Sequence, residues 1–397
     1  MQEKMKIDLE EAIAKHVLRF LPAKSLIRFK SVSKNWYNWI NSPFFTHQQA
    51  THFTKTSAFI SQAYHRFCPF FIPLHRHSHG VPSSAFLPFL PQMSTIRTTS
   101  HGLLCCKSTF QDNTYFIANP TTERWIELPE PTLFHSSVSA LSLAFTPSTY
   151  NFYSHFQLVC AVPIPSVRAV FFEIYSSRTN SWRLSDSQYF YDADHDLSFR
   201  GDGFFMDGFV YWETSNGVIL AFDLTNEEYG EILLPLDLPS PHYGALMEMN
   251  GELCYVTVIT KNHDDGHDNG DDDDCYYWLG VYGGGGHGMV LKKRIPLYDD
   301  NGFFFEGDVR VLSGLSEGAV MILVGSKVIL YHVEERKRRF VGIVEPAEIA
   351  AIDVDDGAVR FLPYVNSLAS VCPVDEMPPE DYEFDKILKK KSRNKIT

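Results

Sequence analysis

The chain has 397 residues, of which 44% are apolar, so it is long enough for two or three domains and a large buried core. Its formal net charge is −13, and it has no run of 18 apolar residues, so we expect no membrane-spanning helix. The N-terminus, MQEKMKIDLEE, is charged where a secretory signal is apolar. We therefore expect a soluble protein of the cytoplasm, the nucleus or both.

The N-terminal part of the chain predicts three short helices. Asp8 and Glu11 form a capping-box pair in front of apolar residues at helical spacing, and Pro22 ends this first run. A second helix is expected over Ala23–Lys30, and a third begins near Ser33. Helices this short cannot bury all their apolar residues among themselves, so part of that surface should face a partner.

Residues in this segment follow the order Leu9, Val17-Leu18, Leu21-Pro22, Leu26, Val32-Ser33 and Trp36. This order resembles the F-box, the motif that docks a substrate receptor onto the Skp adaptor of a Skp–cullin–F-box (SCF) ubiquitin ligase. Glu10 stands where the family has a proline. The resemblance implies a Skp-type adaptor as partner and, through it, cullin and RING subunits. The residues that it assigns to the adaptor surface, or to the core supporting it, are Leu9, Ile13, Val17, Leu18, Leu21, Pro22, Leu26, Val32 and Trp36. An unrelated three-helix subdomain is the alternative.

Charge is distributed unevenly along the chain. Between Ala12 and Gln111 the sequence has eleven Lys and Arg but no Asp or Glu. The first six of these cations fall on the expected helices. Skp-type adaptors are acidic in the family, so the resemblance implies electrostatic steering toward one. A basic segment also suits nucleic acid, but no nucleic-acid partner is expected here.

Beyond Lys55 the pattern changes to period-two apolar runs separated by Gly, Pro, Asn and Asp, which predicts a mainly β body. Helical periodicity is nearly absent up to the C-terminal tail. The clearest expected strands are His101–Cys106, Tyr115–Ala118, Arg168–Tyr175, Phe209–Glu213, Val218–Phe222, Leu253–Thr260, Ala319–Leu323 and Lys327–Val333.

A hairpin repeats along this body. The repeat occurs in YFIANPTTERWIELP, FFEIYSSRTNSWRLS and ILAFDLTNEEYGEILLP. In each, one strand ends, polar residues make the turn, and the return strand carries a large aromatic side chain. The anchors of five copies are spaced by 57, 47, 61 and 50 residues, and they are Trp125, Trp182, Tyr229, Val290 and Phe340. Periods near about 50 residues predict a kelch-like β-propeller of about six blades. A pair of β-sandwiches is the alternative fold.

A closed propeller must join its first and last strands, since an open ring leaves two unpaired sheet edges. Residues Ala58–Gln62 should then lie in one blade with strands from the Ala358–Val371 region. Trp125, Trp182 and Tyr229 should each be largely buried, in three different blades, because a large ring fills the gap between neighbouring sheets.

Several phrases of the body, among them HGLLCC, NPTTERW, GFVYWE, FDLTNEE and FLPYVNSLASV, are similar to the plant F-box-associated domain. This resemblance implies a propeller that recognises a substrate. We therefore expect residues 1–50 to form the F-box, residues 51–372 to form the F-box-associated propeller, and residues 373–397 to be a charged, disordered tail.

Motifs that suggest chemistry are weak. The acidic run 263–274 lacks the ligand pattern of an EF-hand, and YGGGGHG (282–288) lacks the Lys-Ser/Thr of a phosphate-binding loop. His75, His77 and His79 alternate as metal ligands on a strand do, but they lie in an irregular stretch rich in Pro and Phe. Seven cysteines show no C-x-x-C spacing, which favours free, buried thiols. We expect neither a metal nor a cofactor.

The sequence favours a substrate receptor of an SCF-type ubiquitin ligase that recruits a target protein for ubiquitination. No nucleophile–base signature occurs, so an enzyme is not expected. The alternative is a propeller that binds a small ligand or a glycan and carries a non-functional F-box. The aromatic runs 189–191 and 303–305 could stack on a sugar or belong to the core. The sequence indicates neither the target nor the residues that bind it.

Overall fold

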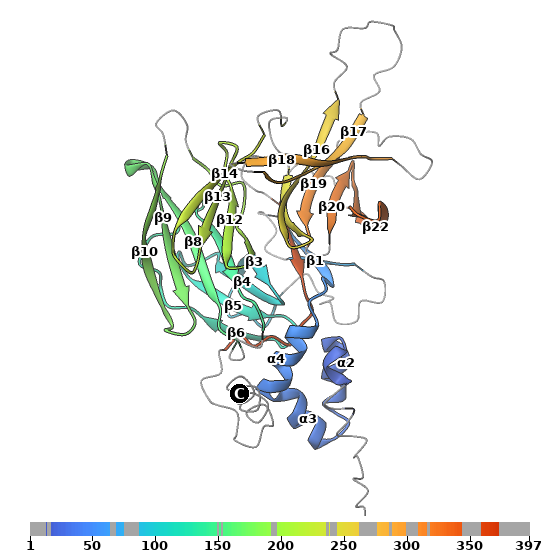
Figure 1. Cartoon of the computed structure of the whole chain (residues 1–397). Helices are drawn as coiled ribbons and strands as arrows, with labels where there is room; N and C mark the ends of the chain where they lie inside the picture. Colours follow the sequence, from blue (N-terminus) through green and yellow to red (C-terminus); the bar gives the residue numbers. More distant parts are fainter. Residues whose placement is uncertain are drawn as a thin grey trace, which may run out of the picture.

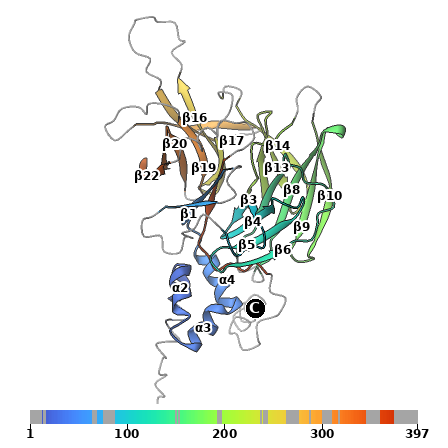
Figure 2. The same cartoon turned by 180° about the vertical axis from the view of Figure 1, so that it is seen from behind.

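A computed structural model places a group of helices at one end of a ring of β-sheets, which Figure 1 and Figure 2 show from opposite sides. The structure describes residues 13, 17–63, 69–74, 87–148, 151, 154–191, 197–235, 238, 244–261, 276–285, 288–298, 309–315, 318–343 and 359–372. Strands dominate these residues, which confirms the predicted mainly β fold with N-terminal helices.

The helical segments of the described chain are η1 (Leu18–Phe20, a 3-10 turn), α2 (Ala23–Phe29), α3 (Lys34–Asn41) and α4 (Pro43–His52), followed within the ring by the short turn η2 (Pro165–Val167). The expected second and third helices are α2 and α3. Ser33 caps α3, since its hydroxyl accepts a hydrogen bond from the Trp36 amide at 3.2 Å. Ser42 caps α4 in the same way through the Phe45 amide. The predicted pair Asp8 and Glu11 lies outside the described residues.

The sequence did not reveal α4. A surface helix carries its apolar residues on one stripe, whereas α4 buries Phe45, His47, Gln49 and Ala50, which point in several directions. Its pattern therefore has no clean helical period. The available signal was the pair Ser42-Pro43, because a capping serine followed by proline is typical of a helix start.

The strands form antiparallel units around the ring. Along the chain they are β1 (Ala58–Ala63), β2 (Phe70–Pro73), β3 (Ser94–Ser100), β4 (Leu103–Ser108), β5 (Tyr115–Asn119), β6 (Arg124–Glu127), β7 (Ala140–Ala144), β8 (Gln157–Ile164), β9 (Ala169–Ser176), β10 (Ser181–Phe190), β11 (Phe204–Met206), β12 (Phe209–Glu213), β13 (Val218–Asp223), β14 (Tyr229–Leu233), β15 (Gly244–Met249), β16 (Glu252–Lys261), β17 (Tyr276–Gly285), β18 (Gly288–Pro296), β19 (Val309–Gly314), β20 (Ala319–Val324), β21 (Lys327–His332), β22 (Lys337–Ile343) and β23 (Val359–Tyr364).

These strands group into blades. Four-stranded meanders are made by β3–β6, β7–β10, β11–β14, β15–β18 and β19–β22, and the last blade contains β2, β1 and β23. The third and fourth meanders are joined into one sheet by a single parallel contact between Leu233 and Gly288. A Cβ atom at Gly288 would lie 3.0 Å from the Leu233 carbonyl oxygen, so this close approach favours glycine.

The blades close into a ring through their inner strands. β3 contacts β7, β7 contacts β11, and the series continues through β15, β19 and β23 back to β3. β23 pairs antiparallel with β1, from Ala58 opposite Tyr364 to Ala63 opposite Val359. The described strands therefore form a closed propeller of six blades, as predicted. The predicted junction of first and last strands is confirmed, and the sandwich alternative was wrong.

The repeated hairpin has a common turn. A side-chain oxygen at its first residue accepts a hydrogen bond from the amide two residues later, as in Asn119 with Thr121 (2.9 Å), Ser176 with Arg178 (3.3 Å) and Asp223 with Thr225 (2.7 Å). Four residues after each of these positions the backbone is left-handed, with φ of 55°, 48° and 56°. Asn, Asp and Ser favour this local bond, which explains why such residues recur at the predicted turns.

The anchor rings of the repeat differ in burial. Trp182 is 8% exposed, but Trp125 is 37% exposed and Tyr229 42%, so the predicted burial of the last two was wrong. They lie on the outermost strands β6 and β14, whose residues are mostly exposed. Trp182 is also on an outermost strand, but the chain before β7 covers it, and its Nε1 donates to the Pro129 carbonyl at 2.7 Å.

We expect Trp182→Ala to lower the free energy of unfolding by about 3–5 kcal/mol, because it removes a buried ring and leaves a cavity. Trp125→Ala is the matched control, and it should cost less than Trp182→Ala, because 37% of Trp125 is already in solvent. Urea unfolding followed by circular dichroism measures both. Equal losses in the two variants would contradict the difference in burial.

Candidate functional site

The N-terminal helices share one small core, and one member of it comes from the other end of the chain. The core consists of Leu18, Ala23, Leu26, Ile40, Phe45 and Leu368. Because Leu368 follows β23, the helices are packed partly on the propeller. We call the segment from η1 to the end of α4 the helical module.

The structure divides the nine residues that were expected to form or support a docking surface. Leu18 and Leu26 are buried, Ile13, Leu21, Pro22 and Trp36 are half-buried, and Val17 and Val32 are 50% and 60% exposed. Leu9 lies outside the described residues. Most of the set therefore supports the module from inside, whereas Val17 and Val32 are open to solvent.

Large apolar side chains are exposed on the module. Between 40% and 60% of each is in solvent, and we refer to this set as the docking face: Val17, Phe20, Ile27, Val32 and Tyr37. Sequence reasoning missed Phe20, Ile27 and Tyr37, although Ile27 follows from the inward position of Leu26 next to it. Exposed apolar groups gathered in one small unit are typical of an interaction site.

A groove lined by cations lies where α2 meets α3. It has a volume of about 350 Å³, and its lining residues are Lys30, Ser31, Ser33, Lys34, Tyr37 and Asn38. Burial lowers the pKa of Lys30, and the charge of Arg124 lowers this pKa further. The sequence supplies no carboxylate between residues 12 and 111, so the groove suits an acidic partner.

Residues 365–371, which we call the strap, tie the module to the propeller. Oε1 of Gln49 on α4 accepts a hydrogen bond from the Leu368 amide at 2.8 Å, and Nε2 of Gln49 donates to the Leu21 carbonyl at 3.5 Å. Asn119, at the end of β5, donates to two strap carbonyls at 3.1 and 2.8 Å. The strap thus bonds to both parts and fixes the orientation of the module on the propeller.

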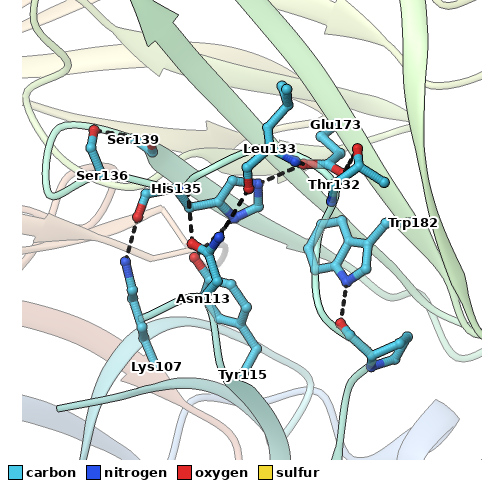
Figure 3. Close-up of polar contacts among 11 residues, drawn as sticks. Lys107, Asn113, Tyr115, Thr132, Leu133, His135, Ser136, Ser139, Glu173 and Trp182 are labelled. Carbon is cyan, nitrogen blue, oxygen red and sulfur yellow. Dashed lines mark hydrogen bonds and ion pairs between the residues drawn. The ribbon is translucent and has the colours of Figure 1, made fainter. Parts of the chain in front are cut away.

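The propeller face away from the module carries a loop whose backbone is held from inside. Residues 129–139, which we call the β6–β7 loop, follow β6, a strand that starts beside the strap and runs away from it. The Glu173 carboxylate accepts hydrogen bonds from the Thr132 and Leu133 amides at 2.7 and 3.2 Å, and from the Thr132 hydroxyl at 2.6 Å (Figure 3).

His135 lies at the centre of this network (Figure 3). Its Nε2 is 2.8 Å from the Glu173 carboxylate, and its Nδ1 is 3.0 Å from the Tyr115 hydroxyl. The His135 amide donates to Oδ1 of Asn113 at 2.8 Å, and its carbonyl accepts from Nζ of Lys107 at 2.6 Å. The side chains of His135 and Glu173 have no exposed surface, so these bonds replace water completely.

The charges of the network follow from its burial. Burial lowers the pKa of His135, so the imidazole is neutral at pH 7 and its Nε2–H is assigned to face Glu173, with Tyr115 donating to Nδ1. Burial alone would raise the pKa of Glu173, but hydrogen bonds from His135 and Thr132 outweigh it and hold this pKa below its usual value. The carboxylate is therefore charged and saturated with donors.

Two protein-family models match the chain. The F-box domain matches residues 8–48, and the F-box associated beta propeller domain matches residues 76–256. The chain carries an F-box domain and an F-box-associated propeller domain. The helical module belongs to the F-box, and F-box domains generally bind Skp-type adaptors.

Proteins similar to this chain occur in Arabidopsis thaliana. F-box protein At3g26010 is 27% identical over 274 residues, which cover 64% of this chain and 63% of that protein. F-box protein At5g07610 is 28% identical over 289 residues, covering 64% and 65%. Putative F-box/kelch-repeat protein At3g22730 is 28% identical over 252 residues, covering 58% and 63%. The chain thus spans slightly less than two thirds of the length of each.

Solved structures show distant likenesses. A mutant of the α-L-arabinofuranosidase arb93a from Fusarium graminearum is 12% identical, with a TM-score of 0.36 over 60% of this chain and 76% of that one. A chain of the mitotic checkpoint complex is 9% identical, with a TM-score of 0.32 over 59% of each. These likenesses assign no activity to the F-box protein.

Within the described ranges no group of three or more His, Cys, Asp or Glu is arranged to hold a metal ion. The acidic run 263–274, the histidines 75, 77 and 79, and the aromatic run 303–305 lie outside those ranges. Of the run 189–191, Tyr189 is buried and only Phe190, at 65%, is largely exposed, so it offers one ring to a ligand.

Cys105, Cys106, Cys160 and Cys254 are free and buried, while Cys372 is exposed. Burial raises the pKa of Cys106 to about 12, so its thiol stays protonated. No helix in the part of the chain that the structure describes is both long and apolar enough to span a membrane.

Gln49→Ala should lower the free energy of unfolding by about 1–3 kcal/mol, because it leaves the buried Leu368 amide without its acceptor. Protection of that amide against hydrogen exchange should fall in parallel. Gln48→Ala is the control, since no hydrogen bond of the Gln48 side chain is seen among the described residues. A Leu368 amide that stays equally protected would show that the strap is held without Gln49.

Stability should decrease as the pH falls. The pKa of His135 is lowered on folding, so its contribution is complete above the unfolded value of about 6.5 and shrinks below it. The pKa of Glu173 is also lowered, so its contribution is complete above about pH 4.3 and is lost as the pH falls through the folded value. Urea midpoints measured between about pH 8 and pH 4 test this, since that range includes both unfolded values.

The matched variant for this pH series is His135→Gln, which keeps a hydrogen-bonding side chain and cannot titrate. Its midpoint should fall less steeply between about pH 7 and pH 5.5 than that of the wild type, because only the wild type charges a buried imidazole there. Parallel curves would show that His135 does not couple folding to pH.

Proposed function

We propose that this F-box protein is the substrate-recognition subunit of an SCF-type ubiquitin ligase. Residues 1–50 would bind a Skp-type adaptor and, through it, cullin and RING subunits, while the propeller of residues 51–372 holds a target protein. The docking face supports this most directly, because it exposes apolar side chains in a segment of the chain that is free of carboxylates. An acidic adaptor with an apolar groove matches both properties.

The strap supports the same proposal. Ubiquitin transfer is favoured when the target stays at one place relative to the adaptor, because a fixed geometry raises the effective concentration of the reacting groups. Gln49 and Leu368 join the module to the propeller by a buried hydrogen bond and by apolar packing. A target held on the propeller would therefore keep a defined position with respect to the adaptor.

The receptor itself is proposed to catalyse nothing. His135 and Glu173 have the chemistry of a catalytic pair, but neither has exposed surface and both already have hydrogen-bond partners. They act as structural groups under the β6–β7 loop. We infer that the protein works in the cytoplasm, the nucleus or both, where SCF subunits would meet it.

Val32→Asp should abolish adaptor binding while the protein stays folded. An unpaired carboxylate that is desolvated in an apolar interface costs on the order of several kcal/mol. Val32 is 60% exposed, so the substitution does not disturb the core. Leu21 is half-buried, so a carboxylate there would disturb folding as well as binding. Calorimetric titration with a Skp-type adaptor measures the effect.

The control makes the same substitution on the propeller. Val290 is 45% exposed on β18, and Val290→Asp should leave the adaptor affinity unchanged. Equal affinity of the wild type and of folded Val32→Asp would refute the docking face.

A further inference from the structure

Apolar side chains project into solvent from the well-held β6–β7 loop and from the turn beside it. Phe134 is 63% and Val138 47% exposed, and Phe110, on the turn between β4 and β5, is 72% exposed. Asn113 joins the two segments. Its Nδ2 donates a hydrogen bond to the Leu133 carbonyl at 3.1 Å, and its Oδ1 accepts one from the His135 amide at 2.8 Å. We call Phe110, Phe134 and Val138 the far-face patch.

The patch lies on the face opposite the F-box. β4 begins just after His101, whose carbonyl accepts a hydrogen bond from the hydroxyl of Ser367 in the strap, and β6 begins after the turn in which Asn119 binds the strap. Both strands run away from the strap, and the two patch segments follow their far ends. An adaptor on the helical module would leave this face open.

The backbone under the patch is ordered before any partner binds. Hydrogen bonds reach the β6–β7 loop from several elements: from Trp182 to the Pro129 carbonyl, from the loop amides to Glu173, from Lys107 to the His135 carbonyl and from Arg97 to the Ser139 carbonyl. Arg97 is itself fixed by Asp202, with N–O distances of 3.0 and 2.9 Å. A loop fixed in this way loses little conformational entropy on binding.

The exposure of these rings needs a reason. A buried aromatic side chain stabilises a protein by roughly 1.5–3 kcal/mol relative to an exposed one, so a segment that served only to connect two strands would gain by turning its ring inward. Aromatic side chains held out from a hydrogen-bonded backbone are instead suited to act as anchors of an interface.

The size and charge of the patch indicate its occupant. An aromatic side chain offers about 150–250 Å², so three exposed side chains fall short of the ~800 Å² per partner of a standard interface between folded proteins. Asp112 and Glu130 lie on the same two segments, both exposed, and neither forms an ion pair within the described residues. A short segment with basic residues complements this surface.

We propose that the far-face patch binds a short linear segment of a protein, in which an apolar side chain stands next to Lys or Arg. The apolar side chain packs against Phe134 and Phe110, and the cation lies near Asp112 and Glu130. That this segment belongs to a ubiquitination target rests on the proposed function; the patch and its binding chemistry do not.

The test uses the full chain and a phage-displayed library of random peptides, since the target is unidentified. Peptides enriched on the wild type should pair an aromatic or aliphatic residue with Lys or Arg. In calorimetric titrations of the synthesised peptides, Phe134→Ala should weaken binding by about tenfold or more, as expected for an anchor. Asp112→Asn combined with Glu130→Gln should weaken it too and reduce its dependence on salt.

Phe340→Ala is the matched control, because Phe340 is 58% exposed on β22 in another blade, and it should bind the peptides as the wild type does. A library that yields no Phe134-dependent peptide, or only peptides without Lys or Arg, overturns the proposal. Self-association of the wild type that is lost in Phe134→Ala also overturns it, since the occupant would then be a second copy of the chain.

A separate titration with a Skp-type adaptor distinguishes the two proposals. Phe134→Ala should bind the adaptor as the wild type does. If the wild type binds peptides but no adaptor, the ligase function fails and the patch stands. If the adaptor binds and no peptide depends on Phe134, the patch fails and the ligase function stands.

Discussion

The antiparallel pairing of β1 with β23 is the interaction on which the rest of the molecule depends. Sheet edges left open expose unpaired backbone groups to other chains, and this pairing removes the two edges that the ends of the body would leave. It also places the chain after β23 on the face of the ring that carries the helical module. Leu368 can therefore enter the core of the helices, and its amide can donate a hydrogen bond to the Gln49 side chain.

The two faces of the propeller are built by different forces. The face toward the F-box is held by the strap, through hydrogen bonds from Gln49 and Asn119 and the packing of Leu368. On the opposite side, buried charges fix the loops, since Glu173 and Arg97 bond backbone that has no regular partner. Buried ion pairs contribute little net stability but favour one arrangement over others. Here that arrangement is the shape of a loop.

Local chemistry made much of the fold predictable. Strand periodicity and turn type depend on neighbouring residues. Asn119, Ser176 and Asp223 each fix their turn by a hydrogen bond to the amide two residues later. The spacing of these turns gave the blade number. The helix α4 escaped because its buried positions follow no single stripe, and Trp125 was misjudged because its coverage depends on a neighbouring blade.

The candidate sites were predictable only in part. All nine expected residues lie within residues 8–48, which match the F-box domain, but burial in a core that includes Leu368 decides which of the described ones face outward, and no local pattern shows that. Glu173 is remote in sequence from the loop it holds, so the network with His135 could not be read from either segment alone. Exposure of Phe134 follows from that network and was equally hidden.

Closure by the last strand has a consequence for synthesis on the ribosome. The helices emerge before the propeller, yet their core lacks Leu368, and Gln49 lacks its donor, until the strap has been made. A chain that stops before Val359 has neither the closing strand nor the strap. The core of the N-terminal helices is therefore completed only after residues 359–371 have been made, when the strand that closes the propeller is present as well.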